Sequence, residues 1–198
     1  SVQQRNTVRF TATALLLAGL VGGAITLLAW LFAGGGTMAC FASTALPSTA
    51  DLMENLLLLL GICLLTGLYE ESYMRVLGIE AFERALDTKR AILASAALFA
   101  LLHVGALDVS AGQLVLLQTA LKFGQALLFG VIMGALYVRT RRLWPCAFIH
   151  AGFDVLYLAP NVLLTGTMPE TYASGAVGDT VLLAVSVLML SGIVLKIR

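Results

Sequence analysis

The sequence predicts an all-α fold, a polytopic membrane helix bundle of about six transmembrane helices with both termini in the cytoplasm. Composition is the first reason: of the 198 residues, 60% are hydrophobic and only 12% are charged, with a mean hydropathy of +0.95. Soluble domains carry about 25% charged residues. The second and third reasons are the lengths of the apolar segments and the placement of basic residues. We expect one membrane-embedded domain over residues 1–198.

Six apolar segments reach, or nearly reach, the length of about 20 residues that a membrane-spanning helix needs. The first follows Arg5 and Arg9, as the apolar core of a signal peptide does. However, it is longer than the 7–15 residues or so of such a core, so we expect a retained helix. The third segment is the shortest. The approximate bounds of the six are 10–33, 52–76, 91–107, 114–138, 143–164 and 180–197.

The basic residues predict the orientation of these helices. The connections 34–50, 108–113 and 165–179 contain no lysine or arginine. Lys122 lies inside the fourth segment, and the other eleven basic residues all fall on the opposite side of the predicted membrane. Because cytoplasmic loops are enriched in lysine and arginine, both termini are predicted to be cytoplasmic. The chain contains no run of basic residues that would indicate a nucleic-acid partner.

Ionisable residues inside the apolar segments indicate a functional site, because such groups are costly near lipid. Glu70 lies near the cytoplasmic end of the second segment, and the chain's only two histidines, His103 and His150, lie in the third and fifth. Asp154 follows one helical turn after His150. If these segments pack together, the four side chains converge on one polar pocket. A carboxylate and an imidazole there could remove a proton from water, and a second imidazole could stabilise an oxyanion.

Helical spacing predicts how the neighbouring side chains support this pocket. Glu71 and Arg75 are four residues apart, with the acid first, so they are expected to form an ion pair. Glu70 lies about 100° around the helix from Glu71 and can face a different partner. Phe99 shares a helix face with His103.

Each residue also has a simpler interpretation. Glu70 and Glu71 could mark the cytoplasmic edge of the second helix, and either histidine could bind a backbone carbonyl. Lys122 could act as a counter-ion or extend toward the membrane surface, and we assign it no role. The occurrence of the four polar residues on three separate helices favours a site.

Two short motifs resemble those of the CPBP family of intramembrane proteases, also called the Abi or type II CAAX prenyl endopeptidase family. The family's EExxxR motif is matched by Glu70, Glu71 and Arg75. Its FxxxH motif is matched by Phe99 and His103. Each motif is weak alone, but these two and a third that follows them, in order and each on a predicted membrane helix, make a specific combination.

A third motif, Hxxx followed by Asn or Asp, is matched by His150 and Asp154. The stretches 129–137 and 143–145 resemble the family's lead-in to it, so the resemblance covers about residues 69–158. It implies a glutamate-dependent protease with a catalytic core at about 52–164. Glu70 and His103 would activate water, and His150 and Asp154 would form the oxyanion side. The supporting residues would be Glu71, Arg75 and Phe99.

Asp154 departs from the prenyl endopeptidases, which have Asn at this position. An ionised carboxylate cannot donate a hydrogen bond to an oxyanion. Asp154 would therefore have to be protonated, or would orient His150. Two imidazoles and several carboxylates could also hold a divalent metal such as zinc, but the chain has no HExxH motif. We expect no cofactor and no metal, with a zinc metalloprotease ranked below the glutamate protease.

The expected partners are the lipid bilayer and a membrane-associated peptide or protein substrate. The small size and short loops favour a multi-pass protein of a prokaryotic cell membrane. The main alternative is a non-catalytic membrane adaptor or bacteriocin-immunity protein that binds a peptide without cutting it. A small proton or ion transporter ranks last, because the sequence has neither the inverted repeat nor the paired broken helices typical of transporters.

Overall fold

The computed structural model describes residues 2–32, 47–104, 112–168 and 173–197, and within these ranges all regular secondary structure is helical. The predicted all-α class is therefore confirmed. In chain order the elements are α1 (Val2–Phe32), α2 (Thr49–Glu71), the π-helical segment η2 (Ser72–Ile79), α3 (Glu80–Phe82), α4 (Thr88–Val104), α5 (Gln113–Thr140), α6 (Leu143–Thr165) and α7 (Val177–Ile197).

Each of the six predicted segments corresponds to a helix. In the described part of the chain, five helices are long and apolar enough to cross a membrane, over Arg5–Leu28, Thr49–Phe82, Gln113–Thr140, Leu143–Thr165 and Val177–Ile197. The third segment forms α4, which has 17 residues and falls short of that length. The predicted ends at 33 and 107 lie outside the described residues.

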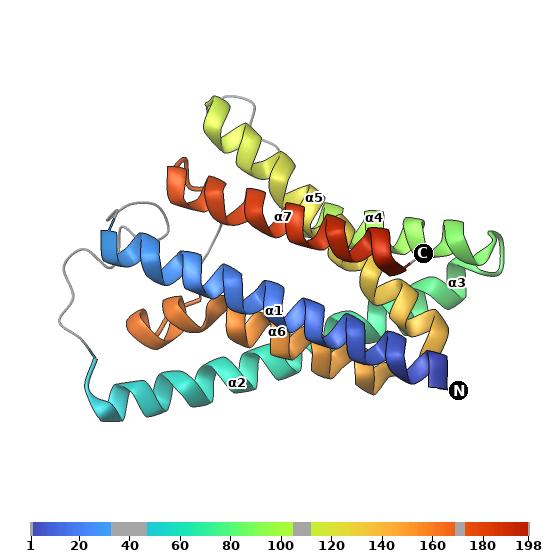
Figure 1. Cartoon of the computed structure of the whole chain (residues 1–198), viewed down its shortest axis with the longest axis horizontal. Coiled ribbons are helices and arrows are strands. Elements are labelled where there is room, and N and C mark those ends of the chain that lie inside the picture. The colour runs from blue at the N-terminus through green and yellow to red at the C-terminus, as the bar shows by residue number, and fades with distance from the viewer. Residues whose placement is uncertain (1, 33–46, 105–111, 169–172, 198) are drawn as a thin grey trace.

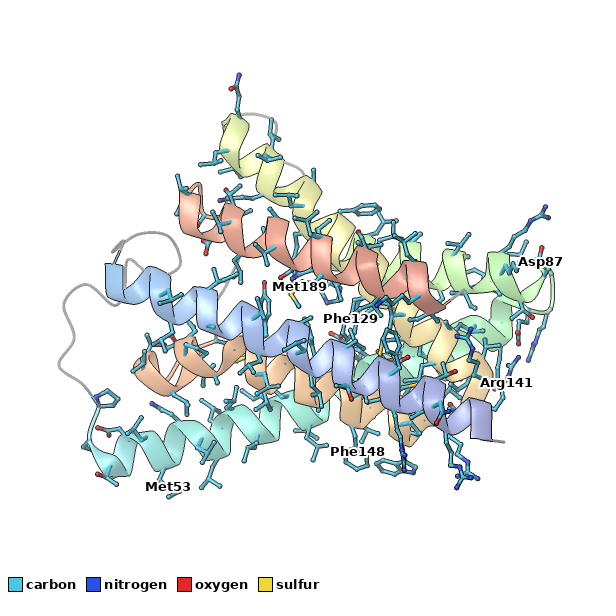
Figure 2. The ribbon with its side chains drawn as sticks, viewed as in Figure 1. Met53, Asp87, Phe129, Arg141, Phe148 and Met189 are labelled. Atoms are coloured by element: carbon cyan, nitrogen blue, oxygen red, sulfur yellow. The ribbon has the colours of Figure 1, made fainter. Side chains whose placement is uncertain are left out.

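The helices form one bundle in which α6 packs against both α1 and α2, while α5 packs against α4 and α7. Figure 1 shows the two ends of the chain at the same end of this bundle. Asp87 and Arg141 lie at that end as well, as Figure 2 shows. Both termini therefore share one end of the bundle with basic residues, and the cytoplasmic orientation of that end stays a prediction.

Glycines allow the helices to approach closely where the bundle is tightest. A Cβ atom on Gly23 of α1 would overlap the carbonyl oxygen of Leu156 in α6. A Cβ atom on Gly130 of α5 would lie 2.9 Å from Cα of Ala96 in α4. Such contacts are typical of membrane helices, where small residues let backbones meet.

Apolar side chains face outward as well as inward, as a lipid environment allows. Phe129 is buried in the core, whereas Met53 and Phe148 are more than half exposed and point away from the bundle in Figure 2. No hydrophobic penalty opposes such exposure when the surrounding medium is lipid.

Candidate functional site

The candidate site lies where the end of α2 meets α4, α5 and α6. Glu70 and Glu71 are the last two residues of α2, immediately before the π-helical segment η2. π-Helical turns are rare and occur frequently at functional sites. Gly67, one turn earlier, faces α6: a Cβ atom there would lie 2.7 Å from the carbonyl oxygen of Ala147. This close approach brings the two glutamates to His150.

Glu71 and Arg75 form the ion pair that their spacing predicts. Nε of Arg75 donates to Oε2 of Glu71 at 2.9 Å, and both side chains are fully buried. The guanidinium also donates to Oγ of Ser95 at 3.3 Å and lies 5.0 Å from the centre of the Phe99 ring. Since an uncompensated buried charge is strongly destabilising, each member of this pair depends on the other.

Glu71 also contacts His150, and the sequence did not predict this contact. Nδ1 of His150 lies 2.8 Å from Oε1 of Glu71. A carboxylate that pairs with arginine can only accept, so Nδ1 of His150 carries the proton and donates it. Arg75, Glu71 and His150 therefore form one buried chain that fixes the orientation of the imidazole ring.

His103 is fixed differently, by its own helix. Its Nδ1 lies 2.8 Å from the backbone carbonyl oxygen of Phe99. A carbonyl oxygen only accepts, so this nitrogen donates, and in the neutral ring Nε2 is left with a lone pair. The simpler interpretation of His103, a bond to a nearby carbonyl, is thus correct, and it leaves Nε2 facing the site.

Glu70 lies between the two histidines. Its Oε2 atom is 3.9 Å from Nε2 of His103 and 3.7 Å from Nε2 of His150. This oxygen is buried and has no hydrogen-bond partner among the described residues. Buried polar oxygens are nearly always hydrogen-bonded, to protein or to ordered water. The geometry therefore suits a water molecule at the glutamate.

Asp154 lies near Nε2 of His150, the nitrogen that Glu70 also faces. Its Oδ2 atom lies 3.4 Å from Nε2 of the imidazole, one helical turn away on α6. Because Nε2 of His150 faces carboxylate oxygens of both Glu70 and Asp154, a fully protonated imidazolium can donate at both of its nitrogens. The four residues predicted to converge, Glu70, His103, His150 and Asp154, are brought together.

A small cavity of about 50 Å³ adjoins these side chains and is lined by His103, His150 and Asp154. One water molecule needs about 10–15 Å³ of such space and a few polar partners, so the cavity can hold water. A second cavity, of about 160 Å³, shares Asp154 with the first and extends between α2, α5 and α6.

Lys122 and Gln125 of α5 line both cavities, although the sequence assigned them no role. Nζ of Lys122 donates to Oε1 of Gln125 at 3.1 Å, and Nε2 of Gln125 donates to the Tyr157 hydroxyl at 3.1 Å. The signal available in the sequence was a lysine and a glutamine three residues apart inside an apolar helix.

Aromatic rings form the apolar wall of the site. The ring centre of Phe99 lies 4.2 Å from that of His103, and Phe129 meets His150 edge to face at 4.7 Å. These contacts restrict both imidazoles and limit the water in the cavity. The supporting role predicted for Phe99 thus has a structural counterpart in its contact with His103 and Arg75.

In the ranges that the structure describes, no group of three or more His, Cys, Asp or Glu side chains has a geometry suited to a metal ion. The described residues brought together here therefore do not fit a zinc centre. The expectation that the protein needs none stays a prediction.

The fold and this site define a polytopic membrane protein with a buried centre of glutamates and histidines. The sequence model of the Rce1-like family, described as type II CAAX prenyl endopeptidase, matches residues 52–156, more than half of the chain. The chain therefore belongs to this family, and membership points to a protease, as the motifs predicted. Searches of curated proteins and of solved structures gave no match.

Proposed function

We propose that this protein is an intramembrane endopeptidase that hydrolyses a peptide bond of a membrane-associated peptide or protein. The observation that carries the proposal is the buried Glu70 oxygen, which has no partner among the described residues and lies within 4 Å of two imidazoles. One of these rings, His103, is oriented to accept a proton at Nε2. The other, His150, is oriented to donate.

In this proposal, Glu70 and His103 act as general bases on one water molecule. The water oxygen attacks the carbonyl carbon of the substrate while its proton passes to the Glu70 carboxylate or to Nε2 of His103. The carbonyl oxygen becomes an oxyanion that accepts a hydrogen bond from Nε2 of protonated His150. The C–N bond then breaks, and the proton taken from water passes to the leaving amine.

In this scheme Asp154 orients His150 and keeps its ring protonated, and it does not donate a hydrogen bond to the oxyanion. Its oxygen lies 3.4 Å from the nitrogen that would meet the substrate. An ionised carboxylate beside an imidazole favours the protonated ring. This role explains how Asp can stand where the prenyl endopeptidases have Asn. Glu71 and Phe99 are positioning residues, because they contact the histidines, and Arg75 is one because it pairs with Glu71.

We further propose that residues 52–164 form the catalytic core of one domain over 1–198. The small size and short connections support a place in a prokaryotic cell membrane. Membership of the family does not by itself make a prenylated CAAX protein the substrate, so a diverse peptide pool is the appropriate first probe.

The test is peptide cleavage by the purified protein, read by mass spectrometry, for wild type and for Glu70→Gln. This change keeps the shape of the side chain but removes the base. We expect it to lower the cleavage rate by at least about 10²-fold, since general base catalysis contributes about 10²–10⁴-fold. Glu54→Gln, an exposed glutamate at the other end of α2, is the matched control and should cleave at the wild-type rate.

A chelator arm distinguishes the alternatives. Cleavage that a chelator abolishes would replace the glutamate mechanism with a metalloprotease. Equal cleavage by wild type and Glu70→Gln would remove Glu70 from the mechanism. If neither protein cleaves any peptide but both bind one, the protein is an adaptor and the protease proposal is wrong.

A further inference from the structure

A third cavity, of about 440 Å³, lies at the end of the bundle that carries both chain termini and shares no lining residue with the two cavities at the glutamate–histidine centre. It is lined by α1, by the end of α5 and by the start of α6. Its lining residues are Arg5, Val8, Arg9, Thr140, Arg142 and Pro145. Three of these six are arginines and none is acidic.

The three arginines lack a carboxylate partner among the described residues. Arg75, Arg90 and Arg141 each form an ion pair there, whereas Arg5, Arg9 and Arg142 form none. Moreover, Arg5 and Arg9 lie one turn apart on α1, and like charges at that spacing repel each other. A bound anion would relieve this repulsion.

The third guanidinium joins this pair because of how the α5–α6 connection is built. The Thr140 hydroxyl donates to the Leu136 carbonyl oxygen at 3.0 Å and accepts from the Arg142 backbone N–H at 3.4 Å. This bond holds the backbone of Arg142 beside α1. Guanidinium groups bind phosphate oxygens with two parallel hydrogen bonds, so three of them suit one phosphate group.

The position of the cavity indicates where the phosphate comes from. Arg5 begins one membrane span, Thr140 ends another, and Leu143 begins a third. The cavity therefore lies at the level of lipid headgroups. Val8 and Pro145 supply apolar wall beside the arginines, which suits a lipid with apolar acyl chains better than a free ion. We propose that this cavity binds the phosphate group of an anionic phospholipid headgroup.

The proposal can be tested by native mass spectrometry of the purified protein titrated with phosphatidylglycerol, phosphatidylcholine or inorganic phosphate. We expect wild type to retain one phosphatidylglycerol in preference to phosphatidylcholine. The double variant Arg9→Gln/Arg142→Gln should bind phosphatidylglycerol about tenfold or more weakly, since each arginine near an anionic headgroup contributes to binding. The control Arg84→Gln/Lys89→Gln removes the same charge from the same end of the bundle and should bind as wild type does.

Equal weakening in both double variants would mean that binding depends only on overall charge, which would overturn the proposal. Inorganic phosphate that binds wild type as tightly as the lipid does would make a soluble phosphate the ligand and would overturn the lipid assignment. If the glutamine variant does not fold, Arg9→Lys/Arg142→Lys replaces it. That variant keeps both charges but loses the paired donors, so it should also bind the lipid more weakly than wild type.

Discussion

At the residue scale, the two histidines of the site are chemically different because their Nδ1 atoms have different partners. In His103 this atom meets a backbone carbonyl, which leaves a neutral ring able to accept at Nε2. In His150 it meets the Glu71 carboxylate, and further carboxylates face Nε2, which favours a ring that donates at both nitrogens. The partner of each Nδ1 atom therefore makes one histidine suited to act as a base and the other as an acid.

Removing Arg75 should destabilise the protein strongly, because it leaves the buried Glu71 carboxylate without its arginine. We expect Arg75→Gln to lower the free energy of unfolding by about 3–5 kcal/mol, as for other broken buried ion pairs. The matched control is Arg90→Gln, whose pair with Asp87 has side chains 75% and 57% exposed, and which should lose only about 0–1 kcal/mol. Thermal unfolding in detergent measures both, and similar losses would contradict the structural role of Arg75.

At the element scale, the site depends on how closely α2 approaches α6. Gly67 lies at the contact, three residues before Glu70, and a Cβ atom there would also come within 3.1 Å of the backbone nitrogen of Ala151. The obstruction is backbone, which cannot move as a flexible side chain can. The distance between the two helices therefore sets the distance from Glu71 to His150.

We predict that Gly67→Val separates α2 from α6, breaks the bond between Glu71 and His150 and lowers peptide cleavage by about tenfold or more, since misplacement by about 1 Å can cost 10²-fold. Gly61→Val is the matched control, because a Cβ atom on Gly61 meets nothing within 4 Å. Cleavage rates of the two variants, with thermal unfolding as a check on folding, measure the effect. Equal rates would mean that this helix contact does not position the site.

A second element-scale contact ties the turn before α4 to the end of α5. Nη1 and Nη2 of Arg141 donate to the two carboxylate oxygens of Glu83 at 2.8 and 2.9 Å. These hydrogen bonds from Arg141 hold the pKa of Glu83 below its ordinary value. Since the folded pKa is depressed, the stabilisation is present above the unfolded value of about 4.3 and is lost as pH falls through the folded value.

We therefore expect Glu83→Gln to unfold at a slightly lower temperature than wild type at pH 7, and the difference to disappear at an acid pH below the lowered folded pKa, where wild-type Glu83 is itself protonated. The effect at pH 7 should be small, at most about 1 kcal/mol, because the pair is near the surface. Thermal unfolding at the two pH values measures it. A difference that persists at the lower pH would show that the contact does not act through the charge of Glu83.

At the scale of the whole molecule, the bundle has two chemically distinct ends. Both chain termini lie at one end, together with the arginine-lined cavity and the pair formed by Arg141 and Glu83. Ser48 and Asp51, which cap the start of α2 with reciprocal hydrogen bonds, lie at the other. Because lysine and arginine concentrate at the first end, that end is predicted to face the cytoplasm.

Thiol labelling with a membrane-impermeant reagent tests this orientation. In a Cys40→Ala background, we expect Ser48→Cys to react in intact cells and Arg84→Cys to react only after the membrane is permeabilised. The remaining cysteines, Cys63 and Cys146, are buried and should stay unlabelled in the folded protein. The reverse labelling pattern would place both termini outside the cytoplasm.

The sequence by itself determined the membrane class, the six helical segments and the shared side of the termini, because hydropathy and charge placement act locally and along the chain. It also identified the pair of Glu71 with Arg75, since residues four apart meet on any helix. The convergence of Glu70, His103, His150 and Asp154 was predicted only on the condition that three helices pack together.

Only the tertiary structure decided which atoms meet across helices. The bond from His150 to Glu71 joins residues 79 positions apart, and no helical periodicity relates them. The position of Lys122 and Gln125 beside Asp154, and the gathering of Arg142 with Arg5 and Arg9, also depend on which faces of α1, α5 and α6 pack together. Side-chain spacing along one helix fixes a face, whereas the choice of its partner depends on close packing of the whole bundle.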